Sequence, residues 1–277
     1  YKRQVLLEAV RKELENDIYK FYVGTSYRHL TIWDKGEVVD LTPPHDVLGQ
    51  KIGQYLPKDD KLREMMKKSY DILSNHPINV ERMKKGLNPA NSLWFWGAGT
   101  RPMLTSFEEK TGHKGAMISA VDLLKGIAVG AGMKVIEVEG ANGGLDTNYE
   151  GKADAAVDVL LNGGCDFAYI HLEAPDEMGH QGSYERKVKA IENLDKRIIK
   201  RVVEKMEAAG EDFRMLVLPD HPTPVAIRTH VSDPVPYMLY DSTDKKNNTW
   251  SYNEKDGEAS GNYIAEGHTI INRLFEK

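Results

Sequence analysis

The feature that most constrains the fold is the rhythm of residues 110–277, where short apolar segments alternate with longer helical patterns. The apolar segments predict strands at residues 116–118, 135–138, 167–170 and 215–218. The patterns between and after them predict helices at residues 121–129, 152–161, 185–208 and 261–275, with a polar surface loop at 241–261. Such alternation is typical of an α/β fold with a mostly parallel sheet flanked by helices.

The first part of the chain has a different pattern, which predicts a smaller α+β domain. Helices are expected at residues 4–16 and 60–75, and strands at 21–23, 29–33, 38–39 and 93–96. Pro43 and Pro44 make residues 42–46 irregular, because proline cannot donate a hydrogen bond to a neighbouring strand. We therefore predict two domains, residues 1–105 and 106–277.

Composition excludes several classes of protein. With 37 basic and 42 acidic residues the chain carries a net charge of −5, which argues against nucleic acid as a partner. No apolar run approaches the roughly 18 residues of a membrane span, so no membrane partner is expected. The single cysteine, Cys165, cannot form an internal disulfide, which favours a reducing, cytoplasmic location. The chain opens at Tyr1 in a helical pattern, without an initiating Met or a signal peptide, which predicts a fragment of a longer protein.

Acidic and histidine side chains follow two of the predicted strands. Asp176 and His180 come after strand 167–170, Asp220 and His221 come directly after strand 215–218, and His230 follows nearby. In open α/β sheets, ligands bind beyond the carboxyl ends of the strands. Carboxylates and imidazoles without a thiolate suit Mn²⁺ or Zn²⁺, and paired metal sites are widely used for phosphoryl transfer. The sequence therefore predicts a metal site.

The spacing within each pair leaves alternatives open. Asp176 and His180 are four residues apart, so they can share one face of a helical turn and meet one cation. The adjacent side chains of Asp220 and His221 are expected to diverge and to reach two separate metals. The first pair can instead be a surface pair or a capped turn, and the second a turn with a helix cap. Their joint placement at one end of the sheet favours the metal site.

Longer motifs carry a resemblance to a known family. Three contain the predicted ligands: residues 171–182 (HLEAPDEMGHQG), 218–224 (LPDHPTP) and 228–236 (RTHVSDPVP). Five more are spread along the chain: residues 26–29, 42–46, 88–92, 118–126 and 145–152. Together they resemble the archaeal-type, cofactor-independent (2,3-bisphosphoglycerate-independent) phosphoglycerate mutases of the alkaline phosphatase superfamily.

The resemblance implies how the two parts are used. Residues 1–105 would form an inserted, substrate-covering α+β domain, and residues 106–277 the C-terminal part of the metal-binding, alkaline phosphatase-like domain. The family also has a metal-binding Asp and a Ser nucleophile in a segment N-terminal to the motifs above. We find no equivalent of either, so the chain is expected to be an N-terminally truncated member that is inactive on its own.

The resemblance also implies a reaction and its metals. Asp176, His180 and His230 would hold one divalent cation, and Asp220 and His221 a second with ligands from elsewhere, Mn²⁺ being favoured over Zn²⁺ or Mg²⁺. The complete enzyme would interconvert 3-phosphoglycerate and 2-phosphoglycerate through a phosphoserine intermediate, in glycolysis and gluconeogenesis. Alternatives are another phosphatase or phosphotransferase of the superfamily, such as a homoserine kinase-like enzyme, or a non-catalytic metal-binding fragment.

Four further residues are candidates for handling the small phosphorylated substrate. Arg28 and Lys125 are predicted to bind it, because cations must neutralise its carboxylate and phosphoryl oxygens. His45 and Asp46, in the proline-stiffened loop, are predicted to move protons between hydroxyl groups. Each has an alternative role: Arg28 as a strand residue paired with Asp34, Lys125 as a solvated helix residue, and His45 with Asp46 as a turn cap.

Overall fold

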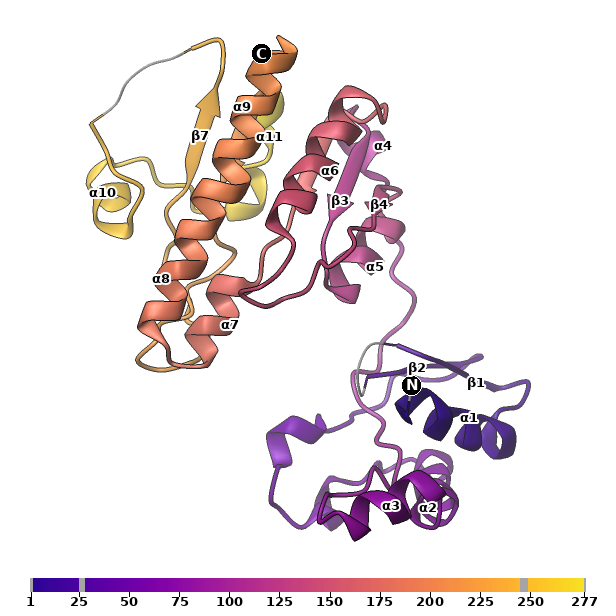
Figure 1. The fold of residues 1–277 in the computed structure, drawn as a ribbon. Coiled ribbons are helices and arrows are strands. Elements are labelled where there is room, and N and C mark those ends of the chain that lie inside the picture. The colour runs from indigo at the N-terminus through magenta and orange to yellow at the C-terminus, as the bar shows by residue number, and fades with distance from the viewer. Residues whose placement is uncertain (1, 25–27, 245–248, 277) are drawn as a thin grey trace. The chain divides into compact units, whose positions relative to one another are not determined.

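The computed structural model describes residues 2–24, 28–244 and 249–276 (Figure 1), and the side chains of Lys2, Arg3 and His45 lie outside this description. The chain divides into two compact units, Tyr1–Pro102 and Met103–Lys277. Each unit is described by itself below. Part of the motif at residues 26–29 falls outside the described residues.

The first unit packs helices against a small antiparallel sheet. Its elements are α1 (Lys2–Leu14), β1 (Tyr19–Tyr22), β2 (Leu30–Trp33), η1 (Pro44–Val47), η2 (Ile52–Tyr55), α2 (Asp60–Ser74) and α3 (Pro77–Lys84). Strands β1 and β2 pair antiparallel, and Tyr19 lies opposite Trp33. Leu7, Val10, Phe21 and Leu62 are buried together between α1, β1 and α2, as the helical spacing of apolar residues predicts. The α+β character of this part is thus confirmed.

Two strands predicted for the first unit are absent from its described residues. Residues 38–39 and 93–96 belong to no strand. Leu93 and Phe95 pack against the core of the unit, while the backbone N–H of Leu93 donates to Ser69 Oγ at 2.8 Å. The indole N–H of Trp94 donates to the carbonyl oxygen of Thr42 at 2.7 Å. The apolar alternation of residues 93–96 therefore reflects packing on the core rather than pairing with another strand.

The second unit contains a parallel sheet with the order β4-β3-β5. Its strands are β3 (Gly115–Ile118), β4 (Lys134–Ile136) and β5 (Phe167–Ile170), and Met117 of β3 pairs with both Val135 and Tyr169. All four residues of β3 are buried, as expected for a central strand. Helix α4 (Phe107–Thr111) precedes β3 in the chain, and α5 (Asp122–Gly130) connects β3 to β4. Helix α6 (Tyr149–Leu161) follows β4.

A long helical run follows β5. It consists of α7 (Ala174–His180), α8 (Tyr184–Asn193), the π-helical segment η3 (Leu194–Ile199) and α9 (Lys200–Ala209). From α8 to α9 the helix is nearly straight and α9 lies beside α6 (Figure 1), so the predicted helix at 185–208 is confirmed. Tyr149, Val202 and Met206 are buried in the core between α6 and this run. The parallel sheet flanked by helices confirms the predicted α/β class.

The C-terminal part differs from the prediction in three ways. The strand expected at 215–218 exists as β6 (Arg214–Val217), but it pairs antiparallel with β7 (Met238–Asp241) in a separate two-stranded sheet. The helix predicted at 261–275 is wrong: among the described residues that range holds only η4 (Gly267–Thr269) and α11 (Asn272–Phe275). The predicted loop 241–261 contains α10 (Glu254–Ala259), whose first turn is capped by the side chain of Asn253.

Candidate metal centre

Helix α7 brings together the first two predicted ligands. It begins four residues after the end of β5, with Pro175 in its first turn, and carries Asp176 and His180 one helical turn apart. The His180 Nε2 atom lies 3.3 Å from Asp176 Oδ2. Both side chains are about one-third exposed, so they are reachable from solvent.

His230 approaches the same carboxylate from a distant part of the chain. Its Nε2 atom lies 3.3 Å from Asp176 Oδ1 and 3.1 Å from His180 Nε2. One possible ligand atom from each of Asp176, His180 and His230 lies within 4.8 Å of the other two. An oxygen and two imidazole nitrogens that converge in this way fit a divalent cation such as Mn²⁺ or Zn²⁺.

The backbone before His230 fixes the orientation of His180. The carbonyl oxygen of Arg228 lies 2.9 Å from His180 Nδ1, and because a carbonyl can only accept, Nδ1 carries the proton. The lone pair of neutral His180 is then on Nε2, the atom that faces Asp176 and His230. Arg228 has a φ of +57°, a conformation that is costly for residues with a side chain and is often found at functional sites.

The Asp220–His221 pair lies directly beside this cluster. The His221 and His230 rings are in contact in a tilted arrangement, with 3.7 Å between their centroids. His221 Nε2 lies 3.4 Å from Asp220 Oδ2, and the backbone N–H of His221 donates to Asp220 Oδ1 at 3.1 Å. The prediction that these two side chains diverge is therefore wrong. They converge, and His221 connects Asp220 to the ligand set around Asp176.

A second pair of polar residues lies at the carboxyl ends of the parallel strands and was not among the predicted site residues. Ser119 follows β3, His171 follows β5, and Ser119 Oγ lies 3.3 Å from His171 Nδ1. Burial lowers the pKa of His171, and the negative charges of Asp220 and Asp176 act in the opposite direction. The placement of both residues directly after predicted strands was the signal available in the sequence.

Of the four residues predicted to handle the substrate, Lys125 belongs to the second unit and lies outside this cluster, while Arg28, His45 and Asp46 belong to the first unit. Lys125 on α5 forms an ion pair with Glu137, with Nζ 2.7 Å from Oε2. In the first unit, Arg28 is exposed two residues before β2, and Asp46 is exposed within η1. The side chain of His45 lies outside the described residues. The roles proposed for these four residues stay predictions.

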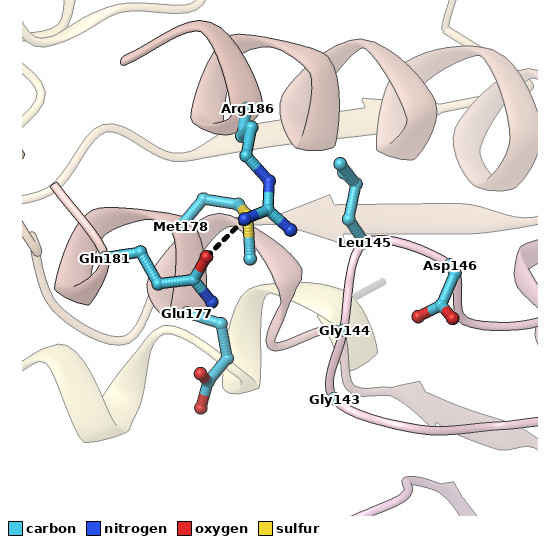
Figure 2. A pocket seen from close by; sticks show the side chains of 8 residues that line it. All are labelled: Gly143, Gly144, Leu145, Asp146, Glu177, Met178, Gln181 and Arg186. Atoms are coloured by element: carbon cyan, nitrogen blue, oxygen red, sulfur yellow. Dashed lines mark hydrogen bonds between the residues drawn. The ribbon is translucent and has the colours of Figure 1, made fainter. Parts of the chain in front are cut away.

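A cavity of about 630 Å³ lies against another face of α7 (Figure 2). Arg186 of α8 donates to Gln181 Oε1 at 2.6 Å across this cavity. Its lining comprises Gly143, Gly144, Leu145, Asp146, Glu177, Met178, Gln181 and Arg186. None of these is a predicted metal ligand, although Glu177 and Gln181 directly follow Asp176 and His180 in the sequence.

Comparisons with known proteins agree with a metal centre. Residues 25–268 match the sequence model of the metalloenzyme superfamily. A 2,3-bisphosphoglycerate-independent phosphoglycerate mutase of Methanosarcina barkeri is 51% identical over 247 residues, covering 87% of this chain and 61% of that protein. A probable enzyme of the same name from Geobacter sulfurreducens is 43% identical over 277 residues, covering 98% and 69%.

Solved structures have the same fold. A Pyrococcus horikoshii protein matches with a TM-score of 0.77 and 26% identity, and the match covers 98% of this chain and 67% of the Pyrococcus chain. A cofactor-independent phosphoglycerate mutase from Thermoplasma acidophilum matches with a TM-score of 0.62 and 24% identity, covering 98% and 68%. The chain therefore spans about three-fifths to two-thirds of the length of the relatives that it matches.

Proposed function

The chain belongs to the 2,3-bisphosphoglycerate-independent phosphoglycerate mutases of the metalloenzyme superfamily, and from this premise we propose that it is part of an enzyme that interconverts 3-phosphoglycerate and 2-phosphoglycerate. The observation that carries the proposal is the convergence of one Asp176 oxygen and the Nε2 atoms of His180 and His230. A small phosphorylated acid is the substrate class, and the proposed setting is glycolysis and gluconeogenesis in the cytoplasm.

Two divalent cations belong to the proposal. Asp176, His180 and His230 hold the first, and Asp220 with His221 contributes to the second together with ligands from outside this set. Mn²⁺ is the proposed metal, because the donors are carboxylates and imidazoles without a thiolate. A bound divalent cation would neutralise negative charge on the phosphoryl group during its transfer. The short distance between the His221 and His230 rings, 3.7 Å between their centroids, supports two neighbouring cation sites.

The remaining roles in the reaction are assigned to residues of both units. The phosphoryl group passes through a phosphoserine intermediate, which splits the transfer into two easier steps. Arg28 and Lys125 bind the substrate anion, and His45 and Asp46 move protons between the two glycerate hydroxyl groups. To bind substrate, Lys125 must give up its ion pair with Glu137. The Glu137 side chain is 73% exposed, so breaking this pair costs little free energy.

Phosphorus NMR tests the proposed reaction. The complete gene product is incubated with 3-phosphoglycerate and Mn²⁺, without 2,3-bisphosphoglycerate, and 2-phosphoglycerate is expected to appear. The Asp220→Ala variant should lose this activity, and the Glu150→Gln variant, altered away from the site, should keep it. Release of inorganic phosphate without 2-phosphoglycerate would instead indicate a phosphatase of the superfamily. No conversion by a folded, Mn²⁺-loaded protein would contradict the proposed mutase function.

The same assay separates the isolated 277-residue chain from the complete protein. The chain alone is expected to be inactive, because the resemblance puts the nucleophile outside it. Mutase activity of the isolated chain would mean that its nucleophile lies among the 277 residues, and the phosphorylated peptide found by mass spectrometry would then identify it. None of the helices in the described part of the chain is a candidate membrane span.

A further inference from the structure

Thr223 lies between the two sets of predicted metal ligands. It is in the loop after β6, and only 3% of its surface is exposed. Its hydroxyl oxygen is 2.5 Å from Asp176 Oδ1 and 3.3 Å from His221 Nδ1. A single buried hydroxyl thus contacts one ligand from each set.

The two contacts fix the direction of the hydrogen bonds. A carboxylate only accepts, so the one hydroxyl proton of Thr223 is donated to Asp176. The hydroxyl oxygen then accepts from His221 Nδ1, which places the proton of the neutral imidazole on Nδ1. The lone pair of His221 is therefore on Nε2, the atom that faces Asp220. The Arg228 carbonyl acts on His180 in the same way.

The surrounding helices hold Thr223 in place. The Lys187 ammonium of α8 donates to the Thr223 carbonyl oxygen at 2.6 Å. Gly179 of α7 lies so close that a Cβ atom there would be 2.5 Å from the same carbonyl oxygen and 3.0 Å from Thr223 Cγ2. Because the neighbour at 2.5 Å is backbone, no side-chain movement relieves this contact. The absence of a side chain at Gly179 is what allows the loop to reach α7.

We propose that Thr223 is a positioning residue that couples the two ligand sets, orienting Asp176 with its hydroxyl proton and His221 with its hydroxyl oxygen. The inference rests on the proposed metal binding. Residues that hydrogen-bond to metal ligands without contacting the metal typically contribute 10- to 100-fold in metal affinity. Removing the hydroxyl without changing the volume should therefore weaken Mn²⁺ binding by about 10- to 100-fold.

The experiment compares Thr223→Val, which lacks the hydroxyl, with Thr223→Ser, which retains it, in the 277-residue chain. Mn²⁺ affinity is measured by the loss of the free-ion electron paramagnetic resonance signal. Thr147→Val is the matched control, because Thr147 is equally buried and its hydroxyl accepts from the backbone N–H of Asn142 at 3.0 Å. We expect weaker binding in Thr223→Val, recovery in Thr223→Ser and no change in Thr147→Val. Equal affinities in Thr223→Val and the unaltered chain would overturn the proposal.

Imidazole nitrogen NMR of the metal-free proteins gives a second, independent result. The His221 tautomer protonated on Nδ1 should dominate in the unaltered chain and in Thr223→Ser, and lose its dominance in Thr223→Val. An unchanged tautomer in Thr223→Val overturns the role of Thr223, whether or not Mn²⁺ binds. Failure of the unaltered chain to bind Mn²⁺ would count against the proposed function instead, so the two failures are distinguishable.

Discussion

Carboxylates gather at two places in the second unit, and they are neutralised differently. On α6, Glu150 accepts from Arg197 at 2.6 and 2.7 Å, and Asp154 accepts from Arg201 at 2.6 and 2.8 Å. The Lys205 ammonium lies 2.8 Å from Asp154 as well. Hydrogen bonding to Arg201 and Lys205 lowers the pKa of Asp154 to about 2. The carboxylates of this group are therefore neutralised by permanently charged side chains of the protein itself.

The surroundings of the Asp176 carboxylate are different. Among the residues that the structure describes, neither lysine nor arginine forms an ion pair with it. It is surrounded by the imidazoles of His180 and His230 and by the hydroxyl of Thr223. Imidazoles carry no permanent positive charge, so the carboxylate of Asp176 is not neutralised in the way that Asp154 is. We infer that the group on α6 stabilises the fold and that the group on α7 attracts a cation from solution.

The largest expected effect follows from removing the negative charge of the α7 group. Asp176→Asn should weaken Mn²⁺ binding by more than about 100-fold, since loss of supporting groups alone costs 10- to 100-fold. The matched change on α6, Asp154→Asn, should leave the affinity unaltered. Calorimetric titration with Mn²⁺ measures both. An equal loss of Mn²⁺ affinity in the two variants would show that the α7 group is no more a metal site than the α6 group.

A smaller effect is expected from the group on α6. Glu150→Gln should lower the free energy of unfolding by about 0.5 kcal/mol, because the Arg197–Glu150 pair is well aligned but about 40% exposed. Urea unfolding measures this change, and Mn²⁺ affinity should stay constant. If Glu150→Gln altered Mn²⁺ affinity while stability stayed the same, the assignment of the α6 group to the fold would be wrong.

Site residues that are close in the sequence could be predicted to meet, and those far apart could not. Asp176 and His180 lie within one helical turn, so their spacing was informative. His230 follows Asp176 by more than fifty residues, and its approach depends on the left-handed backbone of Arg228, which no periodicity signals. The role of Thr223 was equally hidden, because a buried hydroxyl between two ligands leaves no pattern in the sequence.

The same reasoning applies to the fold. The parallel strands and the long helix at 185–208 were predicted because their apolar spacing is regular over each segment. Strand β7 escaped prediction because Pro234 and Pro236 precede it and indicate irregular chain. The helix expected at 261–275 fails where Gly261, with a φ of +70°, starts the segment and Gly267 interrupts it. Strand β7 thus forms by pairing with β6 despite the prolines, whereas in the last segment the glycines outweigh the apolar spacing.

The smallest expected effect is the pH dependence that arises from Asp154 in the α6 group. The pKa of Asp154 is lowered from 3.8 to about 2 in the folded chain, so its stabilising effect is complete above about pH 4 and is lost as the pH falls to about 2. The difference in unfolding free energy between the unaltered chain and Asp154→Asn should shrink over this range. Urea unfolding between pH 2 and 5 measures it, and a difference that stays constant would contradict the assignment.

The most direct test of the metal site at Asp176, His180 and His230 is an anomalous difference map from a crystal of the chain soaked in Mn²⁺ and measured at the manganese edge. A peak is expected within bonding distance of these three residues, and none beside Glu150 and Asp154. A map without a peak at the α7 group, or with its strongest peak on α6, would contradict the assignment of the metal site to Asp176, His180 and His230.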